Sequence, residues 1–219
     1  MKLRLTLLSD ATFGRGDGVA GLVDAEVEHD EYGMPYLRGR TLKGLLAEEA
    51  ANILFALSQF ADKDQINRWK QAARFLFGYP GSDLEANANL HVSDAHLPED
   101  LRQAAIADIS TKRYTPAEVL NSLTTVRRQT AMDESGVPEG ETLRAMRVIL
   151  RETDFEADLH FLRPQDGDSL AFLAACVKAL RRVGTGRNRG RGRVRAALLD
   201  EDQDVTDDLF ARFRKEVQR

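Results

Sequence analysis

Three features are scarce in this sequence, and each scarcity argues against a class of protein. A single cysteine, Cys176, excludes an intramolecular disulfide framework and a thiolate zinc site, and it fits a reducing cytoplasm. No apolar run is long enough for a membrane span, and the first residues carry too short a run for a signal peptide. The formal net charge of −4 argues against a protein that coats nucleic acid over its whole surface. Any contact with nucleic acid must therefore be regional.

Positive charge is concentrated near the C-terminus, between Leu180 and Ala197. This stretch holds seven arginines and four glycines and no acidic residue. Glycine lets the backbone approach a ligand closely, and arginine supplies planar donors for phosphate oxygens. The part that carries the glycines, residues 184–193, is named the glycine–arginine loop, and it is typical of a surface loop that holds phosphates. A solvated basic turn is the alternative.

Periodicity predicts the first elements of the chain. Residues 2–8 alternate leucine with polar residues, which is the period of a half-buried strand. A glycine-rich loop follows, and residues 22–33 then alternate apolar with acidic side chains. If that stretch is extended, Asp24, Glu26 and Glu28 share one face. Such a face either holds a divalent cation or is solvated.

The clearest helix of the N-terminal half lies within residues 35–57, where apolar residues recur at three- and four-residue spacing. Thr41 is its expected N-cap. Three cations surround its N-terminus, where the helix dipole favours negative charge; they are Arg38, Arg40 and Lys43. A bound phosphate would make these cations favourable. The alternative is that their long side chains point into water.

The same patterns predict the rest of the chain. A second helix, Gln65–Phe77, carries Trp69, Phe75 and Phe77, which we expect in the core. Two arms joined by the turn ESGVPEGE predict a long hairpin over residues 122–150. The remaining predicted elements are strands within 87–97, 154–162 and 193–199, a helix over 169–180 and a C-terminal helix over 206–217.

This order of elements approximates a βαββαβ ferredoxin-like core, so the predicted class is α+β. We expect one domain, 1–219, with its core in residues 1–58, 87–97 and 154–199, a helical insertion over 62–80 and a protruding hairpin. RNA-recognition modules share this frame. The aromatic motif of their central strand is missing here, so we do not expect bases to stack on the sheet.

Four stretches, in the same order, resemble the RAMP superfamily, in particular the repeating backbone subunits of type III CRISPR effector complexes. VDAEVEHDEYGMPYLRGRTLKGLL is similar to the family's aspartate followed by the start of a Leu-Lys-Gly helix. NLHVSDAHL resembles its central strand ending in Asp-Ala, and VRRQTAMDESGVPEGETLRAMRVI resembles its thumb hairpin. VGTGRNRGRGRVR resembles its signature glycine-rich loop. The resemblance spans nearly the whole chain.

The resemblance implies a core that polymerises along a CRISPR RNA and a thumb that interrupts the guide–target duplex. The implied partners are CRISPR RNA, target RNA, other RAMP subunits and the large subunit of the complex, in the cytoplasm and away from membranes. The implied RNA contacts are Arg38, Arg40, Lys43, Arg127, Arg128, Met132, Arg187, Arg189, Arg191 and Arg193, with Gly184, Gly186, Gly190 and Gly192 in the signature loop.

In many such subunits a loop aspartate and a divalent metal cut the target RNA, and the motif match places that aspartate at Asp24. The resemblance thus implies a metal-dependent RNA endonuclease that is active within the assembled complex, with Mg²⁺ or another divalent metal held by Asp24. RNA carries its own nucleophile, so one carboxylate that holds the metal or acts as base is enough. Two alternatives stay open: a non-catalytic RNA-binding scaffold, and a ferredoxin-like module that binds a small phosphate ligand.

Overall fold

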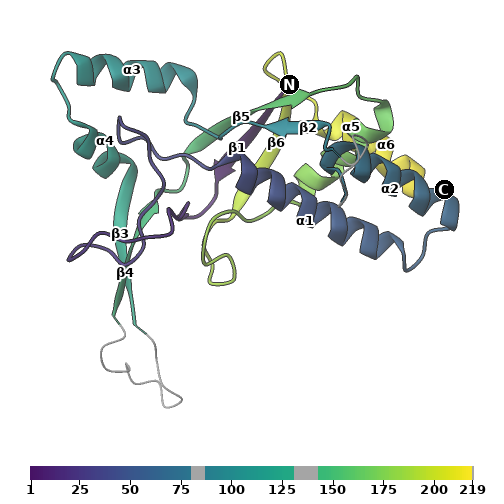
Figure 1. The fold of residues 1–219 in the computed structure, drawn as a ribbon, viewed down its shortest axis with the longest axis horizontal. Helices are drawn as coiled ribbons and strands as arrows, with labels where there is room; N and C mark the ends of the chain where they lie inside the picture. Colours follow the sequence, from purple (N-terminus) through teal and green to yellow (C-terminus); the bar gives the residue numbers. More distant parts are fainter. Residues whose placement is uncertain (80–86, 131–142, 219) are drawn as a thin grey trace.

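A computed structural model describes residues 1–79, 87–130 and 143–218 (Figure 1). Within these residues, a five-stranded antiparallel sheet has the order β2-β5-β1-β6-β7, and β3 and β4 form a separate two-stranded sheet. The strands are β1 (Lys2–Leu7), β2 (Leu90–Val92), β3 (Thr124–Gln129), β4 (Arg144–Ile149), β5 (Asp154–Phe161), β6 (Val194–Asp200) and β7 (Gln203–Asp204). The helices are α1 (Gly39–Leu57), α2 (Lys63–Phe77), α3 (Glu99–Ser110), α4 (Pro116–Leu123), α5 (Gly167–Ala179) and α6 (Thr206–Val217).

Strand β1 occupies the middle of the main sheet because its alternating pattern fits the pleat. Leu3, Leu5 and Leu7 are fully buried in the core, and the polar residues between them are half-buried on the other face. The strand pairs antiparallel with β5 on one side and β6 on the other. The predicted strand over residues 2–8 is therefore confirmed.

The topology is that of a ferredoxin-like core. Helix α1 connects β1 to β2, helix α5 connects β5 to β6, and the four strands lie in the order β2-β5-β1-β6. This arrangement matches the βαββαβ frame, which confirms the predicted α+β class. Helices α2 and α6 pack beside α5 (Figure 1), and α2 occupies the position of the predicted helical insertion.

An aromatic cluster joins the helices in the core. The ring of Trp69 in α2 lies 4.7 Å from that of Phe213 in α6 and 6.0 Å from that of Phe172 in α5, measured between centroids. Trp69 is 1% exposed, and Cys176 is fully buried in α5. Both residues therefore pack as the sequence predicted. None of the helices in the described residues is long and apolar enough to cross a membrane.

Two predicted elements have different bounds in the structure. The strand expected within 87–97 is confined to β2, because the residues after Val92 turn to contact the start of α1. The first arm of the hairpin begins at Thr124, because α4 continues through Leu123. Residues 131–142 of the hairpin, with the predicted RNA contact Met132, lie outside the described residues.

The predicted N-cap of α1 is wrong. The helix begins at Gly39, so Thr41 lies inside its first turn, and the N-cap residue Arg38 makes no capping hydrogen bond with its side chain. The cap comes instead from the segment after β2, where Asp94 Oδ1 accepts a hydrogen bond of 2.7 Å from the N–H of Gly39. That segment packs so closely that a Cβ at Gly39 would lie 2.2 Å from the carbonyl oxygen of Val92.

Two glycines of α1 are expected to respond to alanine in opposite directions. Gly39→Ala should lower the free energy of unfolding by about 1–3 kcal/mol, because the added methyl group overlaps the backbone of the segment after β2. Gly44→Ala should raise it by about 0.5–1 kcal/mol, because alanine favours helix and a Cβ there meets nothing within 4 Å. Urea unfolding followed by circular dichroism measures both. Equal effects would contradict the close contact at Gly39.

Candidate functional site

Three consecutive residues after β1, Asp10–Thr12, anchor the base of the hairpin. Ala11 and Ile149 of β4 exchange two backbone hydrogen bonds, of 3.1 and 2.7 Å. The Oδ2 atom of Asp10 accepts hydrogen bonds from the guanidinium of Arg127 in β3, the shorter being 2.9 Å. Both strands of the hairpin are therefore fixed to the end of the central strand.

The same segment anchors the glycine–arginine loop on its other side, and close backbone contacts explain two of the loop's glycines. The N–H of Thr185 donates to the carbonyl of Thr12 at 2.8 Å. Gly184 has φ 78°, and a Cβ there would lie 2.5 Å from the oxygen of Thr12. Gly192 has φ 67°, and a Cβ there would lie 1.9 Å from the oxygen of Val183. These two glycines allow the protein's own backbone to close around the loop.

The other two glycines of the loop lie at its open end. Gly186 and Gly190 also have left-handed φ values, 69° and 77°. A Cβ would meet no atom closer than 3.9 Å at Gly186 and none within 4 Å at Gly190. Between them the N–H of Arg189 closes a turn onto the carbonyl of Gly186 at 2.8 Å. The backbone at this end therefore remains open to a ligand.

Three of the predicted arginines of the loop face outward. Arg189 and Arg193 are exposed, and Arg187 is half-buried with its Nη1 atom 3.2 Å from Oε2 of Glu48 in α1. This ion pair is exposed on both sides, so it is weak and a phosphate can compete with it. The loop thus presents cations to solvent next to α1.

Arg191 points inward instead, toward the hairpin. It is half-buried and contacts the Sδ atom of Met146 in β4. Burial lowers the pKa of Arg191, and the positive charge of Arg127 adds to this effect. Arg128, next to Arg127 in β3, is exposed. Arg191 thus joins the loop to the base of the hairpin, and the exposed arginines of the two are named the basic surface.

The start of α1 meets the loop across a cavity of about 200 Å³, named the Glu28 cavity. Arg38 and Arg187 both line it, although they come from distant parts of the chain. Arg40 is exposed beside it, and Lys43 is half-buried, with a pKa lowered by burial. The residues that line the cavity are Phe13, Gly14, Glu28, Tyr36, Leu37, Arg38, Thr41, Leu45, Gly184, Thr185 and Arg187.

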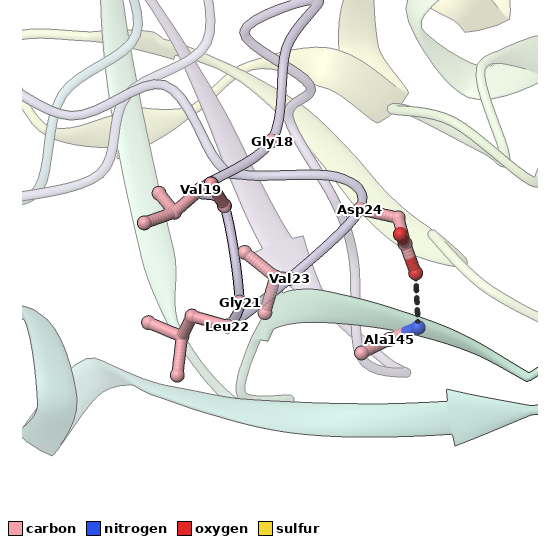
Figure 2. Close-up of a pocket in the computed structure, with 8 residues that line it drawn as sticks. Gly18, Val19, Gly21, Leu22, Val23, Asp24 and Ala145 are labelled. Atoms are coloured by element: carbon pink, nitrogen blue, oxygen red, sulfur yellow. Dashed lines mark hydrogen bonds between the residues drawn. The ribbon is translucent and has the colours of Figure 1, made fainter.

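Asp24 lies in a second cavity, of about 390 Å³, formed by residues 18–24 and Ala145 (Figure 2). Its N–H donates to the carbonyl of Ala145 at 2.7 Å, and its Oδ2 accepts from the N–H of Ala145, also at 2.7 Å. Both bonds join the loop to strand β4 of the hairpin. Asp24 is exposed, and the apolar side chains of Val19 and Leu22 are exposed beside it.

The three carboxylates do not form a shared cation-binding or solvated face. Isolated bridges occur at Val23, Ala25 and Val27, and Asp24 alone of the three carboxylates is exposed. Glu26 is 2% exposed, and its Oε1 lies 2.8 Å from Nε of Arg147 in β4. Glu28 is 8% exposed, and its Oε2 lies 2.8 Å from Nη2 of Arg38. Each buried carboxylate is thus neutralised by an arginine that the local pattern could not reveal.

Asp24 is the residue that the sequence predicts as a metal ligand. In the described part of the chain, no group of three or more His, Cys, Asp or Glu could hold a metal ion. Mg²⁺, however, binds through one or two carboxylates and takes its other ligands from water and substrate phosphates. The exposed carboxylate of Asp24 fits that mode.

Three residues that pair with predicted site residues or with Glu28 were missed by the sequence reasoning. Glu48 pairs with Arg187, Asp10 pairs with Arg127, and the hydroxyl of Tyr36 donates to Oε1 of Glu28 at 3.0 Å. Charged surface residues carry no local sign of their partners, so Asp10 and Glu48 offered no signal. Tyr36 lies inside the stretch that resembles the family's helix start, which was the one usable signal.

The open face of the main sheet is occupied by ion pairs. Glu156 of β5 accepts two hydrogen bonds from Arg4 of β1, at 2.7 and 3.0 Å, and lies 3.3 Å from Nζ of Lys2. These contacts lower the pKa of Glu156 against the opposing effect of its burial. Two cations share this one carboxylate, but Asp154, Asp202 and Asp204 line a cavity on the same face with Arg4. These acids leave little for a polyanion, so the basic surface lies beyond the end of the sheet.

Comparisons with known proteins give one family match and several proteins of similar fold. A family model described as RAMP superfamily matches residues 4–195. A chain in the cryo-EM structure of the Type III-B Cmr-beta bound to cognate target RNA has a TM-score of 0.60 at 14% identity, covering 95% of this chain and 98% of that one. A chain in the apo-state structure of Type III-B Cmr-beta has a TM-score of 0.61 at 14% identity, covering 92% and 98%. No curated protein sequence matches.

The buried pair between Glu26 and Arg147 is expected to stabilise the loop that carries Asp24. Glu26→Ala should lower the free energy of unfolding by about 3–5 kcal/mol, because it leaves the guanidinium of Arg147 buried and uncompensated. The double variant Glu26→Leu, Arg147→Met should lose less than Glu26→Ala alone. Asp17→Ala, which removes an exposed partner of Arg15, should leave stability nearly unchanged.

Urea unfolding of the four proteins, including the native chain, measures these differences. A Glu26→Ala variant as stable as Asp17→Ala would show that the pair does not hold this loop.

Proposed function

This chain belongs to the RAMP superfamily, and on that premise we propose that it is a CRISPR RNA-binding backbone subunit of a type III effector complex. Two solved structures with a similar fold are of Type III-B Cmr-beta, one of them bound to cognate target RNA. The proposed partners are CRISPR RNA, target RNA, other RAMP subunits and the large subunit of the complex. The observation that carries the proposal is the convergence of Arg38 and Arg187 on one cavity.

The outward-facing cations support a path for an RNA backbone. Arg38 and Arg40 at the start of α1 lie beside the glycine–arginine loop with its exposed Arg189 and Arg193. Phosphate contacts supply most of the sequence-independent affinity for nucleic acid, and arginine suits them because its planar fork can bind two oxygens. A guide strand would follow this surface without base readout.

The hairpin fits the role of a thumb. Strands β3 and β4 leave the main sheet as a separate ribbon (Figure 1), and its arms carry the exposed Arg127, Arg128 and Arg144. A ribbon of this kind, anchored at its base by Asp10–Thr12, can reach between the strands of a duplex while its cations contact phosphates.

In this proposal Asp24 is the catalytic residue that cuts guide-paired target RNA. Cleavage forms a bond from the ribose 2′-oxygen to phosphorus while the bond to the 5′-oxygen breaks, and the 2′-OH proton passes to a base as the leaving oxygen gains one. Asp24, exposed beside the hairpin, can take that proton or hold a divalent cation. Such a cation would neutralise charge on the phosphate.

A non-catalytic scaffold is the second candidate function. Glu26 and Glu28 are each paired with an arginine, so Asp24 is the one exposed carboxylate of the three. This observation favours the scaffold. In that case the cations would position RNA for chemistry performed by another subunit.

Replacing Asp24 separates the two candidates. In the assembled complex with Mg²⁺, Asp24→Ala should slow the cutting of a labelled RNA complementary to the guide by about a hundredfold or more, with target binding retained. Asp24→Asn keeps an oxygen for the N–H of Ala145 but loses the charge, so it should lose cutting with the loop undisturbed.

The matched control is Asp17→Ala, which removes an exposed acid of the same loop. The complex with this variant should cut the RNA at the native rate. If both Asp24 variants cut at the native rate, or if no version cuts, the chain is the scaffold.

Binding of single-stranded RNA is expected to weaken with salt. Contact with about five phosphates predicts a slope of about −3.5 for the logarithm of the association constant against that of salt concentration. Arg187→Ala should reduce the slope by about 0.7, because it removes one contact. Arg113→Ala, in the turn between α3 and α4, should leave it unchanged. Fluorescence anisotropy at several salt concentrations measures the slope, and a value near zero would refute an RNA-tracking surface.

A further inference from the structure

The Glu28 cavity combines an apolar floor with a polar wall. Phe13, Leu37 and Leu45 supply the buried apolar side chains. Arg38 and Arg187 lie toward solvent, with side chains that are 59% and 39% exposed. A nucleotide that follows the basic surface would therefore meet cations first and a partly apolar recess behind them.

A carboxylate lies inside this recess. Glu28 is 8% exposed, its Oε1 accepts from the hydroxyl of Tyr36 at 3.0 Å, and its Oε2 pairs with Arg38 at 2.8 Å. Burial raises the pKa of Tyr36, with Glu28 adding to the effect, so the tyrosine stays protonated and donates. An ionised carboxylate has about four acceptor positions in total and no donor. Two positions are used by these partners, which leaves capacity for another donor.

This carboxylate determines which part of a nucleotide can enter. It repels a phosphate, so phosphate stays at the mouth with Arg38 and Arg187. It attracts a hydrogen-bond donor, and the donor that a nucleotide carries next to its phosphate is the ribose 2′-OH. The 2′-OH is also the group that distinguishes RNA from DNA at a given site.

We propose that Glu28 accepts a hydrogen bond from a ribose 2′-OH of the bound strand, so that the Glu28 cavity selects RNA over DNA. The inference rests on the proposed function, because it assumes that a strand follows the basic surface. It adds a specificity residue to that surface: the arginines bind either nucleic acid, and the carboxylate between them distinguishes the sugar.

The chain offers a matched control for this proposal. Glu48 also pairs with an arginine of the cavity mouth, Arg187, but it lies outside the cavity and its side chain is 52% exposed. Removing either acid frees one arginine for phosphate, and therefore should strengthen binding of DNA. Removing Glu28 alone should also abolish the preference for RNA.

The experiment measures the affinity of the full-length chain for three labelled oligonucleotides at one salt concentration. They are oligo(U) RNA, the same length of oligo(dU), and oligo(U) with 2′-fluoro sugars, which keep an RNA-like pucker and lack the donor. The native protein should prefer the RNA over the other two by about tenfold, the effect of one hydrogen bond to a charged group. An oligo(C) series tests the base, whose exocyclic amine is the competing donor.

The variants should separate selectivity from affinity. Glu28→Ala should bind oligo(dU) and 2′-fluoro oligo(U) more tightly and lose the added affinity for RNA, so that the ratio is near one. Glu28→Gln should keep part of the preference through its amide oxygen, and Glu48→Ala should bind all three more tightly with the native ratio. Tyr36→Phe frees Oε1 of Glu28, so it should keep or increase the preference. Thermal unfolding verifies that each variant is folded.

Three results would overturn the proposal. Equal affinity of the native chain for RNA and 2′-fluoro RNA would exclude a hydroxyl contact, and an unchanged ratio in folded Glu28→Ala would exclude Glu28 as its acceptor. If the protein binds oligo(C) more tightly than oligo(U), and binds RNA and DNA of one sequence equally, the cavity binds a base and not the sugar. If the native chain binds none of the oligonucleotides, the proposed function fails and this inference fails with it.

Discussion

The backbone pairing of Asp10–Thr12 is the contact on which the arrangement of the site depends. On one side it bonds to β4 of the hairpin, and on the other it holds the glycine–arginine loop through Thr185 and Gly192. The side chain of Thr12 adds a bond to the carbonyl of Arg147 at 2.9 Å, in the buried part of the hairpin. This segment therefore bonds to both the hairpin and the loop, and direct contacts of Arg191 with Met146 and of Asp24 with Ala145 add to it.

The ferredoxin-like core serves this site as a support, and its sheet face takes no part in it. Arg4 and Lys2 pair with Glu156 across β1 and β5, and Asp154, Asp202 and Asp204 add negative charge to the same face. The glycine–arginine loop beyond the strands carries exposed arginines instead, such as Arg189 and Arg193. A fold that other proteins use to stack bases on a sheet here presents its basic groups beyond the strand ends, where the hairpin also begins.

Local patterns predicted the elements, and distant pairings limited the prediction of the site. The alternating leucines of β1 and the apolar stripe of α1 are signals within a few residues, so their order was enough to predict the ferredoxin-like core. Arg38 and Arg187 were both predicted, and they share a cavity. Asp94, however, caps α1 across 55 residues of sequence, and Glu26 and Glu28 are buried by arginines from other segments. Each of these acids is equally compatible with a solvated surface, so sequence alone could not assign their partners.

The anchoring of the hairpin has a mechanical consequence. The three residues Asp10–Thr12 bond to β4 and also to the glycine–arginine loop. They therefore link the hairpin mechanically to the loop. A load applied to the described strands of the hairpin would be transmitted through these backbone hydrogen bonds to the loop. The main sheet would act as the fixed frame.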